Sequence, residues 1–136
     1  MEHIGIIGTG FMGSAVIRAI VREHGELQLG MVEKDGSRRD WATRELGAQD
    51  FSSKPEELFG FANVIILAIK PQDLGSFGEQ IGSAARNALV VSMLAGTSIE
   101  TVGRALGTRR VVRIMPNLAA DIGKAVTGIC FSAELD

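Results

Sequence analysis

Residues 3–13 of the chain read HIGIIGTGFMG, a short apolar run followed by a glycine-rich turn. Residues 3–7 form an apolar run typical of a short buried strand, and Gly8, Gly10 and Gly13 follow it in the spacing G-x-G-x-x-G. Over residues 11–23 the apolar side chains recur with the period of a helix. A strand, a glycine turn and a helix in direct succession are typical of a loop that binds the pyrophosphate of a dinucleotide. A plain strand–helix turn stays an open alternative, because a chain with 17 glycines also meets this spacing by chance.

Strands and helices alternate along the rest of the chain. Two capping boxes, Ser53-Lys-Pro-Glu56 and Thr97-Ser-Ile-Glu100, indicate helix starts, and Gly47 indicates a helix end. The alternation predicts an α/β fold with a doubly wound parallel sheet of the Rossmann type, helices on both faces, and one dinucleotide-binding domain over residues 1–136. We expect strands at 3–7, 27–32, 64–69, 89–94, 111–115 and 126–131, and helices at 11–23, 37–46, from 53 on, at 72–86 and at 97–106.

The composition of the chain excludes several classes of protein. Fourteen basic against sixteen acidic residues give a net charge of −2, so the basic surplus of a nucleic-acid-binding protein is missing. The single cysteine, Cys130, allows no intramolecular disulfide, and with only two histidines beside it we expect no metal site. The longest apolar run, 64–69, is too short to span a bilayer, and no secretory signal opens the chain. We therefore expect a cytoplasmic protein that binds neither nucleic acid nor membranes.

An acidic residue stands where dinucleotide-binding folds read the adenine ribose. Glu33 follows the second predicted strand, 20 residues after Gly13, and a carboxylate there can accept hydrogen bonds from the ribose hydroxyls. It would also repel a 2′-phosphate, which favours NADH slightly. Lys34, Arg38 and Arg39 follow closely, and they can either pair with that phosphate or form a solvated charged loop. The sequence therefore predicts a dinucleotide and leaves NADH and NADPH both open.

The ends of the later strands carry the remaining candidates. Ligands of open parallel sheets bind outside the carboxyl ends of the strands, which here are 68–71, 93–96 and 115–117. Small residues such as Ala95 and Gly96 can lie against a nicotinamide ring, and Asn117 can hydrogen-bond its carboxamide or a substrate. His3, His24 and Cys130 suit structural roles, which leaves Lys70 and Asp121 as ionisable candidates. So few acid–base groups favour a protonated imine as substrate, because its reduction needs mainly positioning.

Four segments resemble the N-terminal cofactor-binding domain of pyrroline-5-carboxylate reductase. They are residues 4–13, 64–72, 91–96 with Ile99-Glu100, and 112–117, which occur in the family's order and cover almost the whole chain. The resemblance implies reduction of 1-pyrroline-5-carboxylate to L-proline in proline biosynthesis, with a positioning role for Asn117. With Glu33 and the strand ends, the expected contacts to NADH or NADPH are Gly8, Thr9, Gly10, Phe11, Met12, Gly13, Glu33, Lys34, Ala68, Lys70, Pro71, Ala95, Gly96, Met115 and Pro116.

The chain also departs from this family. Leu118 and Ala119 follow Asn117 where the family has Thr-Pro, and Ala125 replaces a glycine. The family's C-terminal helical domain, which forms the dimer and completes the substrate pocket, is absent from the 136 residues. We therefore expect a cofactor-binding half with little activity alone, and a homo-oligomer once that domain is present. Two alternatives stay open, a non-catalytic dinucleotide-binding or sensor module and a domain of a related NAD(P)-dependent dehydrogenase.

Overall fold

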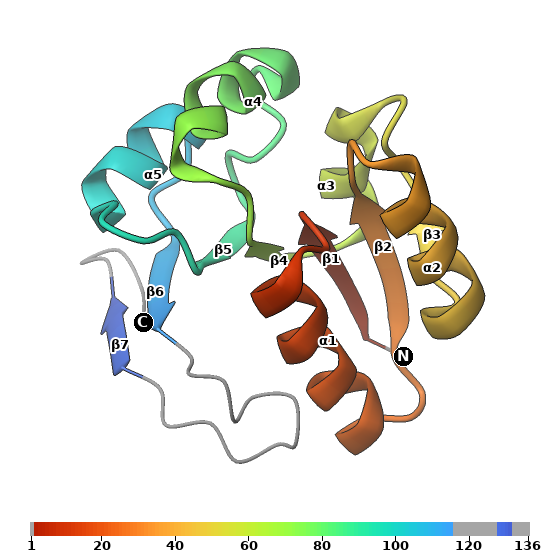
Figure 1. Ribbon diagram of the computed structural model, residues 1–136. Coiled ribbons are helices and arrows are strands. Elements are labelled where there is room, and N and C mark those ends of the chain that lie inside the picture. The colour runs from red at the N-terminus through yellow and green to blue at the C-terminus, as the bar shows by residue number, and fades with distance from the viewer. Residues whose placement is uncertain (1, 116–127, 132–136) are drawn as a thin grey trace.

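A seven-stranded sheet forms the centre of the computed structural model, which describes residues 2–115 and 128–131 (Figure 1). The strand order is β3-β2-β1-β4-β5-β6-β7, and the first six strands in the chain are parallel. This arrangement confirms the predicted doubly wound, Rossmann-type α/β fold. The strands are β1 (His3–Ile7), β2 (Gln28–Val32), β3 (Gln49–Asp50), β4 (Val64–Leu67), β5 (Leu89–Ser92), β6 (Val111–Met115) and β7 (Gly128–Phe131).

The last strand departs from the prediction of a wholly parallel sheet. β7 pairs with β6 in the antiparallel direction, with Met115 opposite Gly128 and Val112 opposite Phe131. Residues 116–127 separate the two strands, which is about the minimum length for a parallel crossover, whereas an antiparallel return needs fewer residues. The sheet is therefore mixed at this edge.

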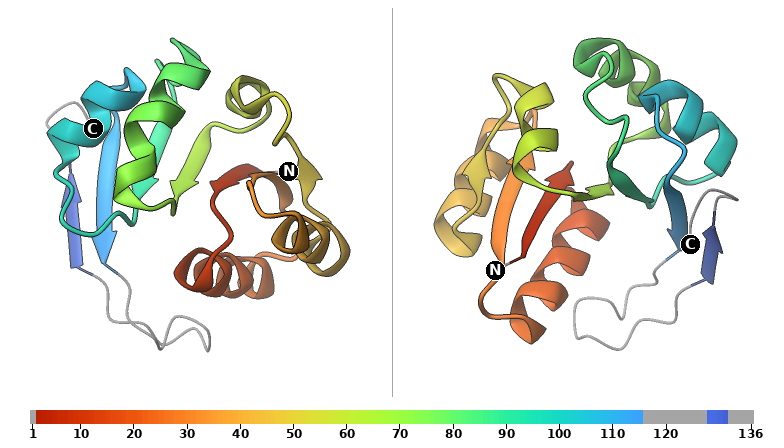
Figure 2. Two further views of the ribbon diagram at one scale, coloured as in Figure 1. Left: turned by 45° about the horizontal axis from the view of Figure 1, so that its top comes forward. Right: turned by 180° about the vertical axis from the view of Figure 1, so that it is seen from behind.

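Helices cover both faces of the sheet (Figure 2). One face carries α1 (Phe11–Glu23) and α2 (Gly36–Leu46), and the other carries α3 (Leu58–Phe61), α4 (Leu74–Ile81) and α5 (Ile99–Leu106). Two short 3₁₀ turns, η1 (Pro55–Glu57) and η2 (Pro71–Asp73), precede α3 and α4. The central strand β4 packs into both cores, since Ile66 faces α1 and α2 while Ile65 and Leu67 face the other helices. Its continuous apolar run thus reflects burial on both faces, as predicted.

Several strands and helices end at other residues than predicted. β1, α1 and β6 have the predicted ends, whereas β4 and β5 each end two residues early. The helix predicted to reach residue 86 ends at Ile81, because Gly82 takes a left-handed φ of +58°. No helix among residues 2–115 and 128–131 has both the length and the apolar character needed to cross a bilayer.

Both predicted capping boxes are wrong. In α5 the capping residue is Ser98, whose Oγ accepts the Thr101 N–H at 3.2 Å, while the hydroxyl of Thr97 donates to the Ala95 carbonyl. Before α3, Pro55 takes the first position of η1, so Lys54 stands at the cap without a side-chain bond and Ser53 lies further out. The prediction that a helix begins at each place was right, but each capping position lies one residue after the predicted one, at Lys54 and at Ser98.

Candidate functional site

The carboxyl ends of β1, β2 and β4 meet at a cleft of about 690 Å³. This volume lies in the usual range for a small-molecule or cofactor site. Most of the predicted contact residues line the cleft, from the glycine loop, the end of β2, the end of β4 and the end of β5. They are Gly8, Gly10, Phe11, Glu33, Lys34, Ala68, Lys70, Pro71 and Ala95.

Gly8 and Gly13 are required by the fold itself. Gly8 has a φ of +91°, and a Cβ there would lie 2.6 Å from the Ala68 carbonyl oxygen. A Cβ at Gly13 would lie 2.5 Å from the Gly8 carbonyl oxygen, so α1 packs directly on the turn. The predicted conformational roles of these two glycines, a tight turn and a close helix–strand approach, agree with the structure.

Gly10 differs from its two neighbours because the fold would tolerate a side chain there. Its φ of −71° is ordinary, and the nearest atom to an added Cβ is Nη1 of Arg38 at 3.7 Å. The residue therefore presents bare backbone to the cleft without any packing need to do so. Close approach of a ligand to this backbone is the remaining physical reason for a glycine at this position.

The first turn of α1 opens on the cleft as a site for negative charge. Gly10 is the capping residue, and it supplies no side-chain hydrogen bond to the helix. The first turn holds no acidic residue, so no side chain within it competes for the positive end of the 13-residue helix dipole. The N–H groups of that turn have no intrahelical partner, and such groups bind phosphate at many helix starts.

Thr9 is held from two sides. Its N–H and its hydroxyl both donate to Oε1 of Glu33, at 2.7 and 2.9 Å, and its carbonyl accepts the Ser14 hydroxyl at 2.6 Å. Glu33 is 5% exposed, and its second oxygen, Oε2, accepts the Asp35 N–H at 2.9 Å. The structure thus places Glu33 at the cleft, as predicted, with its carboxylate bound to the protein. The brace from Ser14 was not predicted, because a hydroxyl at the fourth helical position carries no recognisable pattern.

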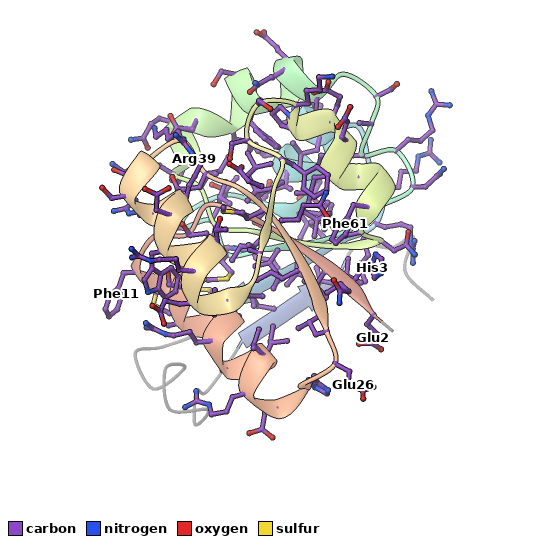
Figure 3. All side chains as sticks on the ribbon, turned by 90° about the vertical axis from the view of Figure 1, so that its right-hand side faces the viewer. Glu2, His3, Phe11, Glu26, Arg39 and Phe61 are labelled. Atoms are coloured by element: carbon purple, nitrogen blue, oxygen red, sulfur yellow. The ribbon has the colours of Figure 1, made fainter. Side chains whose placement is uncertain are left out.

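Two of the three basic residues after Glu33 are engaged with the protein. Arg39, labelled in Figure 3, donates from Nη1 to the carbonyls of Glu33 and Lys34 at 2.9 and 3.0 Å. Lys34 pairs across the cleft with Asp73, and its Nζ lies 3.1 Å from Oδ2. All three basic side chains, Lys34, Arg38 and Arg39, line the cleft.

The end expected to hold the nicotinamide is described only in part. Ala95 lines the cleft, whereas Gly96, which follows β5, and Met115, the last residue of β6, do not line it. Thr9, Met12 and Gly13 also do not line the cleft, and Thr9 and Gly13 are buried behind it. Phe11 is 71% exposed and points away from the protein (Figure 3). The remaining candidates and departures, Pro116, Asn117, Leu118, Ala119, Asp121 and Ala125, lie outside the described residues.

The two histidines lie away from the cleft, as expected. His3 is at the opposite end of the sheet, where its ring lies beside Phe61 (Figure 3) and Nδ1 is 3.0 Å from the Phe61 carbonyl oxygen. His24 caps the carboxyl end of α1 through its backbone. Cys130 falls within β7.

The sequence reasoning missed the wall of the cleft that η2 and α4 form. Asp73, Ser76, Phe77 and Gln80 line it, and their spacing of three, four and seven residues marks one face of a helix. The stripe is visible in the sequence, but a mixture of polar residues and one aromatic does not reveal which surface it faces. Ser52 and Pro55 complete the opposite wall.

The chain is similar to several known reductases. "Pyrroline-5-carboxylate reductase 2" of Bacillus subtilis is 34% identical over 98% of the chain and 49% of its own length. Structures of pyrroline-5-carboxylate reductase from Coxiella burnetii (TM-score 0.87, 20% identity) and of pyrroline carboxylate reductase from Plasmodium falciparum with NADP bound (TM-score 0.82, 22% identity) match 99% of the chain, and 51% and 50% of their own. The chain thus spans about half the length of the relatives that it matches, and the predicted resemblance is confirmed. The model of the family "NADP oxidoreductase coenzyme F420-dependent" matches residues 3–96, and the chain belongs to this family.

Proposed function

We propose that this chain is the cofactor-binding domain of an NAD(P)H-dependent imine reductase of the pyrroline-5-carboxylate reductase type. The reaction would be the reduction of 1-pyrroline-5-carboxylate to L-proline, so the partner is a cyclic imine carboxylate. One observation carries the proposal from the structure: bare backbone at Gly10, beside the uncapped start of α1, faces a cleft of cofactor size. The names of the relatives support the choice of reaction.

The residues present fit a reduced nicotinamide dinucleotide. The pyrophosphate would lie against Gly10 and the first turn of α1, where N–H groups and the helix dipole stabilise negative charge. The adenosine half would lie between the end of β2 and the wall formed by α4. The nicotinamide would lie toward Lys70-Pro71 and Ala95-Gly96. We also assign Met115, Pro116 and Asn117 to this end of the cofactor, on the resemblance to the reductase family. When bound, the cofactor supplies the hydride.

An imine as substrate would require little acid–base chemistry of the cleft. Among the residues described as lining it there is no histidine, cysteine or tyrosine, and its ionisable groups are Glu33, Lys34, Arg38, Arg39, Lys70 and Asp73. A protonated imine already carries the positive charge that a ketone gains only from a positioned acid. The protein must then mainly hold the substrate against the cofactor. We assign part of this positioning role to Asn117. We also propose that the protein forms a homo-oligomer, with contacts made by the half of the relatives' length that the chain does not span.

Titration of the folded chain with NADPH and NADH tests the proposal, with Gly10→Val as the decisive variant. Valine at this position would place two methyl groups where the pyrophosphate approaches, and we expect binding to weaken by roughly tenfold or more, about 1.4 kcal/mol. The melting temperature should change little, because an added Cβ meets nothing closer than 3.7 Å.

Gly25→Val is the matched control. Gly25 lies in an exposed turn where an added Cβ meets no atom within 4 Å, so this variant should bind like the wild type. Absence of cofactor binding to folded wild-type protein would refute the proposal.

A further inference from the structure

The carboxylate of Glu33 has little capacity left for a ligand. Its three hydrogen bonds, to the Thr9 N–H, the Thr9 hydroxyl and the Asp35 N–H, use three of about four acceptor positions. Binding both hydroxyls of a ribose would require Glu33 to release at least one of these donors. Thr9 is 3% exposed, so either of its two donors would lie in a poorly hydrated place if Glu33 released it.

We infer that Glu33 positions the glycine loop instead of reading the adenine ribose, and that Arg38 selects the 2′-phosphate of NADPH. This inference rests on the proposed function and names the residues that determine its cofactor. It also reverses the slight preference for NADH that an acidic residue at this position predicts.

The brace at Thr9 explains why the loop needs a carboxylate. Thr9 lies between Gly8, which turns the chain, and Gly10, which begins α1 and faces the cleft. Glu33 holds its N–H and hydroxyl, and Ser14 holds its carbonyl, so the direction of the backbone entering Gly10 is set from both sides. Bonds to an ionised acceptor are about twice as strong as neutral ones, which makes the Glu33 side the stronger half of the brace.

Arg38 is the one cation of the three that the protein leaves available. Arg39 is committed to two carbonyls of the turn after β2, and Lys34 is paired with Asp73. The guanidinium of Arg38 forms no hydrogen bond or ion pair with any residue that the structure describes, and it extends over the loop to 3.7 Å from the Cβ position of Gly10. A guanidinium beside the pyrophosphate site is well suited to a second phosphate, which it can bind in a bidentate way.

Cofactor affinities of three variants separate the two roles. We expect Arg38→Ala to weaken NADPH by roughly tenfold or more, the usual loss for a charged hydrogen-bond partner, and to weaken NADH much less. Arg44→Ala removes the same charge from the same helix, two turns further on, and should change neither affinity. Glu33→Gln should weaken NADPH and NADH by the same factor, so that their ratio stays that of the wild type.

Other results would overturn the inference. If Glu33→Gln weakens NADH selectively or strengthens NADPH, then Glu33 reads the ribose. If Arg38→Ala weakens both cofactors equally, Arg38 does not select the phosphate. Should Glu33→Gln fail to fold, Ser14→Ala tests the other half of the brace and must likewise weaken both cofactors equally at an unchanged melting temperature. Failure of the wild type to bind either cofactor would refute the proposed function instead.

Discussion

Among single residues, the ion pair between Lys34 and Asp73 joins the end of β2 to η2 across the cleft. Lys34 is 78% exposed and Asp73 35%, so the pair contributes little to stability, about 0–1 kcal/mol. Its effect on a ligand is different, because Asp73 places a negative charge beside an anionic cofactor and occupies a cation that the cofactor can use. The pair therefore opposes cofactor binding.

Asp73→Asn should strengthen NADPH binding. We expect an increase of about two- to fivefold at low ionic strength, the size of a partly exposed charge interaction, that diminishes as salt is added. Titrations at two salt concentrations measure it. Glu79→Gln, on the adjoining helix α4 but outside the cleft lining, is the control for net charge. An unchanged affinity in Asp73→Asn at low salt would contradict this account.

Residue positions at the site could be predicted from the sequence better than side-chain directions. The spacing from Gly13 correctly placed Glu33 at the cleft. It did not reveal that the carboxylate turns back on Thr9, because that direction depends on two donors, the Thr9 N–H and hydroxyl, which only the folded turn brings within 3 Å. In the same way Arg39 and Arg38 are neighbours in sequence, yet one binds the turn and the other faces the cleft.

At the scale of elements, α3 packs unusually close to the sheet. Gly5 and Gly30 lie side by side on β1 and β2, and Leu58 of α3 fills the space that side chains would take. A Cβ at Gly30 would lie 2.7 Å from Cδ1 of Leu58 and 2.9 Å from ring atoms of Phe51 and Phe61. These glycines serve packing, since neither has a positive φ.

Gly30→Ala should destabilise the fold by about 1–3 kcal/mol, because the added methyl would meet side-chain atoms of Leu58, Phe51 and Phe61 at less than 3 Å. Urea unfolding measures the change. Gly60→Ala within α3 is the control: an added Cβ there meets no atom within 4 Å, and alanine should stabilise the helix by about 0.5–1 kcal/mol. Equal stability of Gly30→Ala and the wild type would show that Leu58 can move away without cost.

The sequence predicted the ends of elements best where a glycine or a proline marks them. Gly8 follows β1, Gly10 precedes α1 and Pro116 follows β6, and the structure has these ends where they were predicted, whereas β4 and β5 each end two residues early. β3 was missed, because its two residues, Gln49 and Asp50, are exposed and too few to show any alternation. Helix caps were misplaced for a similar reason: Thr97 and Ser98 are both good capping residues, and only the path of the loop decides between them.

At the scale of the whole molecule, the strand order collects the candidate residues at one edge. β1 lies between β2 and β4, so the glycine loop, Glu33 and the Ala68–Pro71 segment meet although they are far apart in sequence. This meeting follows from right-handed crossovers and could be predicted. The α4 wall could not, since its place against the cleft depends on how η2 turns the chain after β4.

Catalytic activity depends on how the substrate is held beside the nicotinamide. Hydride transfer requires the substrate to be held about 3–3.5 Å from the nicotinamide, and loss of that positioning costs a factor of about 10² or more. The chain spans about half the length of the relatives, so we expect the 136 residues alone to bind NADPH and to reduce 1-pyrroline-5-carboxylate at less than about a hundredth of the rate of a full-length relative. The loss of reduced-nicotinamide absorbance measures this rate, with the Bacillus subtilis reductase as the reference.

Extension of the chain to the length of its relatives separates the remaining interpretations. If the family reaction is the right one, the extended chain gains turnover, and Asn117→Ala then lowers turnover while cofactor affinity stays unchanged, because a positioning residue acts on the substrate held beside the cofactor. Rapid turnover by the 136 residues alone would show that the substrate pocket is complete without a second half. An extended chain that binds cofactor and leaves 1-pyrroline-5-carboxylate unreduced would favour a sensor module or another dehydrogenase, since a glycine loop that binds the cofactor suits both and does not fix what approaches the nicotinamide.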